Sequence, residues 1–291
     1  MSQPNNVFRN SLLIGLVLSL LCTGLSAADD IRLLKDLSYK MGNTTDYERQ
    51  RCKLDFYLPQ DREGFATIVW FHGGGLRNGD KAGDIAVALG RRFATSGIAV
   101  ASVNYRLHPN VEFPAYIEDA AAAFYFVRRK IIEHGGSPDR VFISGHSAGG
   151  YLAAMVGVDG QFLAKHKLKL GDIAGLMPVS GQMITHSTVR AERGIASTRP
   201  IVDQAAPTFH AREDTAPFLV VAGSQDLPAR AEENRYFVAA MKAAGHKNVT
   251  YLEVEGRNHG TIANRIGEAN DAVANAMIDF IERQRRDEQR R

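Results

Sequence analysis

Residues 140–150 of the chain, RVFISGHSAGG, decide the fold. The first five are a short apolar run typical of a buried strand, and a helical pattern begins at Ala148. Between them, Ser147 occupies a turn whose neighbours Gly145, Ala148 and Gly149 are all small. A sharp strand-to-helix turn forces its central residue into strained backbone angles, which only small neighbours tolerate. The setting therefore predicts that Ser147 is presented at a strand end, where a nucleophile is needed.

Apolar, β-rich runs alternate with longer helical stretches on both sides of this motif. The predicted strands are residues 66–71, 98–104, 140–144, 173–179, 217–222 and 249–254. The predicted helices are residues 84–96, 117–132, 148–157, 230–244 and 268–284. Strands joined through helices imply right-handed crossovers and a mostly parallel sheet with helices on both faces. Residues 37–58 add one or two antiparallel edge strands, and no linker interrupts the pattern, so we expect a single α/β domain.

Composition excludes several classes of protein. The 291 residues are 45% hydrophobic and 23% charged, which argues against a disordered chain or a multi-span membrane protein. A formal charge of +3, without clustered basic residues, argues against nucleic-acid binding. Cys52 would be alone after removal of a leader that holds Cys22, so we expect no intrachain disulfide. No cysteine and histidine spacing indicates structural zinc.

The N-terminus is typical of an export signal. Arg9 precedes the apolar run 12–21, and small residues at 26–28 suit a signal peptidase. We therefore predict a signal peptide over residues 1–28, a mature domain over 29–291, and export to the periplasm or the medium. The apolar run is shorter than the roughly 20 residues of a membrane span, so no stable span is expected in the mature protein.

Two other interpretations of the leader are open. Cys22 could be the acylated residue of a lipoprotein, but Leu21 stands where a small residue should precede that cysteine, so we prefer cleavage. An uncleaved anchor ranks third.

A serine hydroxyl needs a base to take its proton, and histidine is the usual base. His259 is the one histidine that follows the last predicted strand, which places it at the same sheet edge as Ser147. The remaining histidines lie on predicted helices, in turns or in the least patterned segment, where a solvated surface side chain is the default expectation. They are His72, His108, His134, His146, His166, His186, His210 and His246.

A carboxylate must orient the histidine and stabilise it once it is charged. Asp226 follows the predicted strand 217–222, and the chain order serine, acid, histidine is the one expected when these groups end successive strands. Asp119 and Asp139 are rival acids better explained by caps or ion pairs. Glu255 is a closer rival, but it shares a loop with His259 and would have difficulty reaching the imidazole from behind.

Residues 72–75, HGGG, are candidates for an anion-binding turn. Glycines allow backbone N–H groups to approach an oxyanion closely, so we name Gly74, Gly75 and Ala148 as its donors. A phosphate-binding loop is excluded, because neither the G-x-G-x-x-G spacing nor a Walker lysine is present. The chemistry predicted for these groups requires no metal and no cofactor.

Together these motifs resemble the α/β-hydrolase superfamily, and within it the HGGG-bearing carboxylesterases of the acetyl-esterase and feruloyl-esterase-like type, related to hormone-sensitive-lipase-like esterases. Further matching stretches are LDFYLP at 54–59, GDK at 79–81, NYRL at 104–107, FPA at 113–115 with Asp119, and SPDR at 137–140. The resemblance covers nearly all of residues 29–291. It implies Ser147 as nucleophile, Asp226 and His259 as its partners, and Gly74, Gly75 and Ala148 as the oxyanion hole.

Two departures from the family pattern bear on the substrate. Leu76 stands where an aromatic residue often follows the glycines, which leaves the acyl-chain preference open. Few residues precede the first predicted strand, so the helical N-terminal cap of the hormone-sensitive-lipase-like branch has no counterpart. Residues 181–215 are the least patterned stretch and are our candidate for a substrate-facing cap.

We therefore expect an exported serine carboxylesterase acting on small-molecule esters of small acids, including acylated carbohydrates. One alternative keeps the same triad but makes the enzyme an amidase, similar to arylformamidases, or a peptidase. Another alternative is a hydrolase-fold binding protein without turnover, which the retention of Ser147, Asp226 and His259 disfavours. The sequence indicates no oligomeric state.

Overall fold

The computed structural model describes residues 31–289 and the initial methionine. Residues 2–28 of the predicted signal peptide, including Cys22, lie outside the described residues. Within residues 31–289, no helix is long and apolar enough to cross a membrane.

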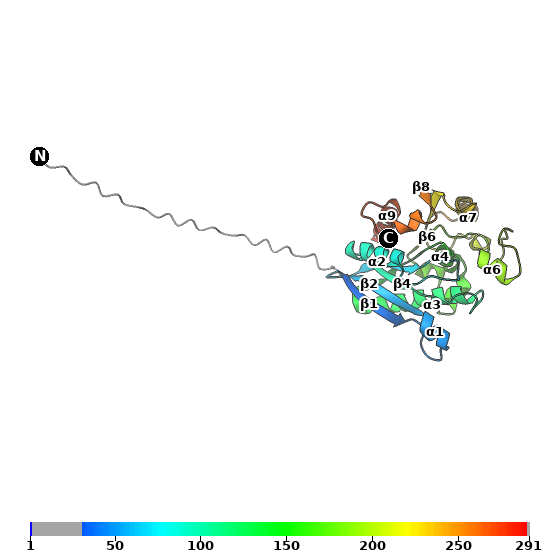
Figure 1. Ribbon diagram of the computed structural model, residues 1–291, viewed down its shortest axis with the longest axis horizontal. Coiled ribbons are helices and arrows are strands. Elements are labelled where there is room, and N and C mark those ends of the chain that lie inside the picture. The colour runs from blue at the N-terminus through cyan, green and yellow to red at the C-terminus, as the bar shows by residue number, and fades with distance from the viewer. Residues whose placement is uncertain (2–30, 290–291) are drawn as a thin grey trace.

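The centre of the fold is one eight-stranded sheet in the order β1-β2-β4-β3-β5-β6-β7-β8 (Figure 1). Its strands are β1 Ile31–Ser38, β2 Lys53–Pro59, β3 Phe65–Phe71, β4 Ala99–Val103, β5 Gly136–His146, β6 Gly175–Val179, β7 Phe218–Gln225 and β8 Val249–Asn258. β1 and β2 pair antiparallel at one edge, β2 pairs antiparallel with β4, and the remaining pairs are parallel. The predicted α/β class and the antiparallel edge are confirmed, although β1 begins at Ile31, six residues before the predicted edge segment.

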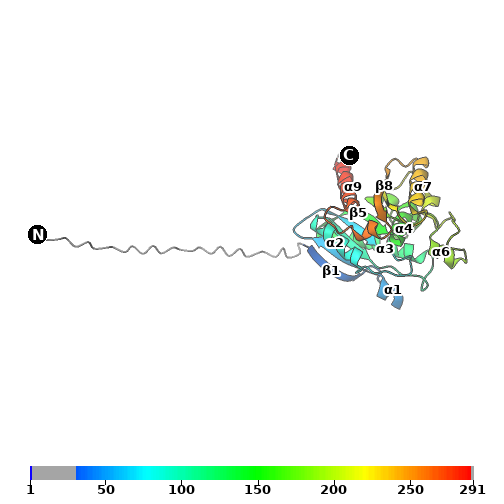
Figure 2. The same cartoon turned by 45° about the horizontal axis from the view of Figure 1, so that its top comes forward.

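Helices cover both faces of the sheet, as Figures 1 and 2 show. They are α1 Asp46–Arg51, α2 Asp84–Thr95, α3 Ala115–Lys130, α4 Ala148–Val158, α5 Gly160–Ala164, α6 Ser187–Glu192, α7 Arg230–Ala243, α8 Thr261–Asn264 and α9 Ala272–Gln289. Three 3₁₀ turns span Ile131–His134, Leu170–Asp172 and Pro207–His210.

Alternation along the strands divides the interior into two cores. In β3 every side chain is buried, which is what a strand covered on both faces requires. Val69 and Phe71 pack with α3, α4 and α7, whereas Ile68 and Trp70 pack with α2, α8 and α9. The near-continuous apolar run was therefore the right signal for a central strand.

Element ends differ from the predicted ones where polar side chains decide them. The last helix was predicted to begin at residue 268, but it begins at Ala272, because Asp271 Oδ1 accepts a hydrogen bond from the N–H of Ala274 and caps the helix there. The short helix α1 was not predicted. Thr45 and Glu48 form a capping box at its start, a local signal inside a segment without an apolar face.

Candidate active site

Ser147 lies in the turn between β5 and α4, with φ 57° and ψ −115°. This left-handed backbone is the strain that the motif predicted. A Cβ atom at Gly149 would lie 2.0 Å from the carbonyl oxygen of Phe71, and one at Gly145 would lie 2.6 Å from the backbone of Gly149. The start of α4 therefore packs directly against the end of β3, and only glycine fits at these two positions.

The structure brings the three predicted triad residues together. The distance from His259 Nε2 to Ser147 Oγ is 2.9 Å, and the distance from His259 Nδ1 to Asp226 Oδ1 is 2.6 Å. His259 directly follows β8 and Asp226 directly follows β7, so parallel strands deliver both side chains to the sheet edge where β5 presents Ser147. The spacing suits proton transfer between serine and histidine. The roles of the three residues stay predictions that substitution can test.

The rival acids have other surroundings. Asp119 is buried and pairs with Arg106 at 2.8 Å, while Asp139 pairs with Arg128 at 2.9 Å. Glu255 is exposed on β8. Neither ion-paired acid contacts His259, in agreement with the explanation by ion pairs.

Asp226 is held as a carboxylate by groups that sequence reasoning missed. Ser180 Oγ donates to Asp226 Oδ2, and the N–H of Leu227 donates to Asp226 Oδ1 at 2.7 Å. Burial raises the pKa of Asp226, but these bonds and the one to His259 outweigh it and lower that pKa to about 2. Ser180 directly follows β6, so its position after a predicted strand was the available signal.

Ser180 is itself constrained. It is fully buried with φ 50°, and Arg230 Nη1 donates to its carbonyl oxygen at 2.6 Å. A non-glycine residue in this conformation is strained and must be held by its neighbours. Arg230 therefore helps to fix the serine that orients Asp226.

His146, the variable residue of the motif before Ser147, contacts the main chain of His259. The distance from His146 Nε2 to the carbonyl oxygen of His259 is 2.8 Å, and since a carbonyl only accepts, Nε2 carries the proton. Burial first, and then the neighbouring His259, lower the pKa of His146 to about 3. His146 is therefore a neutral donor that ties the loop of His259 to the nucleophile turn.

The expectation of solvated histidines was wrong at four positions. His72, His146, His186 and His246 are all buried. Each has a hydrogen bond to a backbone group, which lets a neutral imidazole lie in the interior. Helix and turn assignments alone do not show this, because burial depends on what packs over the turn.

The predicted oxyanion glycines follow Gly73, the residue of this loop that lies against Ser147. Gly74 and Gly75 have φ of 107° and 63°, and a Cβ atom at the preceding Gly73 would lie 3.4 Å from Ser147 Cβ. Among the described residues, no group accepts a hydrogen bond from the backbone N–H of Gly74, Gly75 or Ala148. Ala148 begins α4, where N–H groups lack helical partners and the helix dipole is positive.

The side chain of His72 contacts this turn and holds it in place. Its Nδ1 lies 2.7 Å from the carbonyl oxygen of Gly73, and its ring stacks on Tyr105 at 4.4 Å between ring centroids. Burial is the main cause that lowers the pKa of His72 to about 4. A neutral, stacked imidazole is suited to holding the loop rather than to acting as a base.

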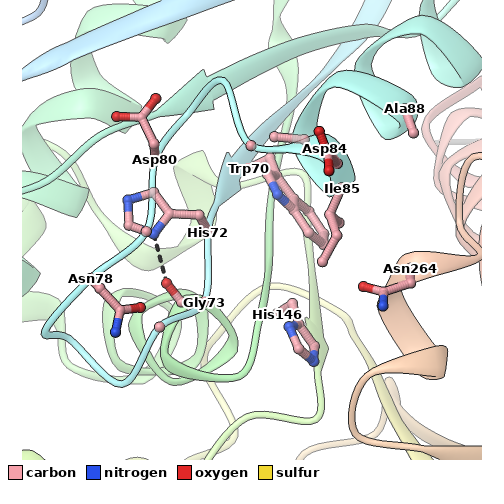
Figure 3. Close-up of a pocket in the computed structure, with 14 residues that line it drawn as sticks. Trp70, His72, Gly73, Asn78, Asp80, Asp84, Ile85, Ala88, His146 and Asn264 are labelled. Carbon is pink, nitrogen blue, oxygen red and sulfur yellow. Dashed lines mark hydrogen bonds between the residues drawn. The ribbon is translucent and has the colours of Figure 1, made fainter.

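A cavity of about 650 Å³ adjoins the oxyanion glycines (Figure 3). Figure 3 shows Trp70, His146 and Asn264 around the same space. Gly73 and Gly74 also line it, and Asn78, Asp80 and Asp84 add oxygen atoms to its wall. Asn264 ends α8, the helix that follows His259, so the oxyanion loop and α8 both contribute to the cavity wall. Among the described residues, Ser147 and His259 themselves do not line it.

Within residues 31–289, no group of three or more His, Cys, Asp or Glu side chains is arranged to hold a metal ion.

Residues 117–287, more than half of the chain, match the model of the prolyl oligopeptidase family. The chain belongs to this family. A second model, described as BD-FAE, matches residues 54–172. The sheet, the helices on both its faces and the strand-end site are those of an α/β hydrolase, so the resemblance to that superfamily is confirmed.

Several sequence relatives of the chain are named as esterases. Over 107 residues it is 40% identical to a probable isoprenylcysteine alpha-carbonyl methylesterase of Oryza sativa, with 37% of this chain and 25% of the relative covered. It is 26% identical to esterase LipC of Mycobacterium tuberculosis, with 67% of this chain and 52% of the relative covered. The chain thus spans about half the length, or less, of these two relatives.

A solved structure has the same fold. The truncated form of a carbohydrate esterase from gut microbiota superposes with a TM-score of 0.73 at 19% identity, with 89% of this chain and 98% of that chain covered. At this identity the likeness concerns the fold alone.

Substitution of Asp226 tests whether this residue, rather than Glu255, is the acid that orients His259. We expect Asp226→Asn to lower kcat on an ester by about 10⁴-fold, because the amide favours the wrong histidine tautomer and cannot stabilise the imidazolium. Glu255→Gln, the matched acid-to-amide control, should stay within about twofold of the unchanged protein, because Glu255 is exposed. Steady-state kinetics of both variants test this, and the reverse pattern would make Glu255 the acid.

The low pKa of Asp226 should make folding stability depend on pH. A carboxyl with a pKa of about 2 in the folded protein and about 3.9 in the unfolded chain stabilises the fold fully above pH 3.9, and this stabilisation is lost as the pH falls through 2. Asp226→Asn should therefore unfold at lower urea concentration than the unchanged protein at pH 6, and the gap should shrink by pH 2.5. An equal difference in urea midpoint between the two proteins at pH 6 and pH 2.5 would contradict the low pKa of Asp226.

Proposed function

We propose that the chain is a serine hydrolase that cleaves carboxylic esters through an acyl-enzyme. The observation that carries the proposal is the hydrogen-bonded series of Ser147, His259 and Asp226 beside N–H groups without acceptors. A nucleophile, a base, an orienting carboxylate and an anion-binding loop are the parts that acyl transfer needs.

The reaction proceeds in two halves. His259 Nε2 takes the proton of Ser147 as its Oγ attacks the ester carbonyl, and the N–H groups of Gly74, Gly75 and Ala148 stabilise the resulting oxyanion. The protonated His259 then gives its proton to the departing alcohol oxygen, which leaves the acyl group on Ser147. Water attacks this acyl-enzyme with His259 again as the base, and the acid is released.

The names of the relatives support esters as the bond that is cleaved. A methylesterase and an esterase are among the sequence relatives. The family model suggests a second candidate, because its description is that of a peptidase family, and the same triad would cleave an amide if His259 protonated the departing nitrogen. We favour the ester because both of these relatives carry that name.

The cavity supports an alcohol that bears hydroxyl groups, such as the sugar of an acylated carbohydrate. The departing oxygen must face His259 Nε2, and we propose that the alcohol portion extends from there into the cavity that Gly74, His146 and Asn264 line. The carboxylate of Asp84 and the amide groups of Asn78 and Asn264, which line different sides of the cavity, can hydrogen-bond to hydroxyl groups.

Export is a separate proposal that rests on the leader-like sequence at 1–28. Mass spectrometry of the protein recovered from a cell fraction tests it. A mature protein that begins near residue 29 outside the cytoplasm is expected, and a cytoplasmic chain with the leader intact would contradict it.

Turnover and covalent labelling test the main proposal. A fluorophosphonate probe should label the unchanged protein but not Ser147→Ala, and only the unchanged protein should hydrolyse a small acetate ester at a measurable rate. The matched acetamide should turn over at least about 100 times more slowly if the enzyme is an esterase. Labelling without turnover on any ester or amide would instead favour a binding protein.

The same hydrolysis assay tests which alcohol portion of the ester the enzyme prefers. Acetate esters of methanol and of a monosaccharide share one acyl group, so their ratio of kcat/KM isolates the alcohol side. We expect the sugar ester to have the higher value, and we expect Asp84→Asn to lower this ratio without changing the rate on methyl acetate. Equal values for both esters would remove the support for a carbohydrate substrate.

A further inference from the structure

The backbone of the oxyanion loop, residues 72–76, has an unusual conformation. Three consecutive residues have positive φ, at 107° for Gly74, 63° for Gly75 and 60° for Leu76. A chain curled in this way can gather its N–H groups on one side, as in an anion-binding nest. Leu76 is fully buried and pays a steric penalty of roughly 1–3 kcal/mol for its left-handed angle. The loop conformation must therefore be imposed by its surroundings.

The carbonyl groups of the loop are the points at which it is held. The oxygen of Gly73 faces His72 Nδ1, and the oxygen of Gly74 accepts from the N–H groups of Arg77 and Asn78. The oxygen of Leu76 accepts from the N–H of His108 at 2.8 Å. Side chains of distant segments hold two further carbonyl groups: Tyr105 Oη donates to the oxygen of His72 at 2.8 Å, and Thr188 Oγ1 donates to the oxygen of Gly75 at 2.6 Å.

Gly75 is the part of the loop with the least steric restraint. A Cβ atom there would meet no atom within 4 Å, whereas one at Gly74 would lie 2.2 Å from the carbonyl oxygen of Asn78. A glycine without packing neighbours is free to rotate, because it has no Cβ to limit its angles. The hydrogen bond from Thr188 fixes the peptide group that joins the carbonyl of Gly75 to the N–H of Leu76. It thereby limits the backbone angles of Gly75, whose own N–H belongs to the preceding peptide group.

Thr188 is itself well fixed. Its side chain is buried on α6, and His186 Nδ1 accepts a hydrogen bond from its N–H at the start of that helix. At the other end of α6, Glu192 accepts from the N–H of Phe113 at 3.0 Å and from the hydroxyl of Tyr116 at 3.2 Å. α6 is thus capped at its start by His186 and attached at its end, where Tyr116 connects it to α3.

We propose that Thr188 is a positioning residue of the oxyanion hole, through which the candidate cap, residues 181–215, sets the aim of the loop N–H groups. The inference rests on the proposed function, because the oxyanion belongs to that reaction. Donors that are aimed in advance stabilise charge that exists only in the transition state. Loss of the Thr188 hydroxyl should therefore affect the chemical step and leave substrate binding nearly unchanged.

Three variants isolate the hydroxyl. Thr188→Val keeps the shape of the side chain but removes the donor, and Thr188→Ser restores a donor. Thr208→Val is the matched control, since Thr208 lies in the same segment, is equally buried, and donates to the carbonyl oxygen of Met183 at 2.7 Å without contacting the loop. Each protein is assayed for kcat and KM on a small acetate ester, for the inhibition constant of an alkyl boronic acid, and for its melting temperature.

We expect Thr188→Val to lower kcat by about 10- to 100-fold, less than the loss of a whole oxyanion donor, with KM within twofold. The inhibition constant of the boronic acid should rise with the fall in kcat/KM, because its tetrahedral adduct places an oxygen in the same hole. Thr188→Ser should recover most of the loss. Thr208→Val should change the melting temperature by a similar amount while both kinetic measures stay within twofold.

Several results would overturn the proposal. One is a Thr188→Val protein whose kcat and boronic acid inhibition constant stay within twofold of the unchanged protein. Another is an equal loss of kcat in Thr208→Val. The third is a loss of kcat in Thr188→Val that Thr188→Ser does not restore. If the unchanged protein hydrolyses no ester, the proposed function fails, but the boronic acid affinities of the variants still decide the role of Thr188. An unchanged protein that does not bind the boronic acid would overturn both.

Discussion

The site depends on one constraint, which is the close packing of the α4 backbone, at its start, against the end of β3. A Cβ atom on Gly149 would lie 2.0 Å from the carbonyl oxygen of Phe71, so only glycine allows this close approach. It forces the chain to turn sharply after β5 and gives Ser147 its positive φ. The same contact brings the oxyanion loop, which follows β3, next to the nucleophile. One backbone approach thus sets both the strain at Ser147 and its distance from the anion-binding groups.

Around this contact, the charged and neutral groups are separated in a way that suits acyl transfer. Asp226 is held as a carboxylate by three hydrogen bonds, and its pKa is about 2. His72 and His146 are buried, and burial lowers the pKa of each well below neutrality. They act as neutral hydrogen-bonding groups that hold loops. They therefore add no charge beside the one that develops at Ser147 and His259 during the proposed reaction.

Much of the fold was predictable, because the strands from β3 to β8 are short apolar runs and the helices between them are periodic. The convergence of Ser147, Asp226 and His259 was predictable because each follows a predicted strand, and parallel strands end at one edge of the sheet. Ser180 and Thr188 were missed because a single hydroxyl in a polar segment has no distinguishing pattern. Four histidines were wrongly expected on the surface, since burial depends on tertiary packing over a turn and not on the turn itself.

The amino-acid sequence by itself determined the class of fold, the strand-to-helix turn and the identity of the groups that converge, because these depend on local periodicity and on which residues tolerate a tight turn. Only the tertiary structure decided how those groups are held. The contacts from Ser180 to Asp226, from His146 to His259 and from Thr188 to Gly75 join residues 46, 113 and 113 positions apart. Hydrogen bonds across such separations depend on the packing of whole elements, which no local pattern encodes.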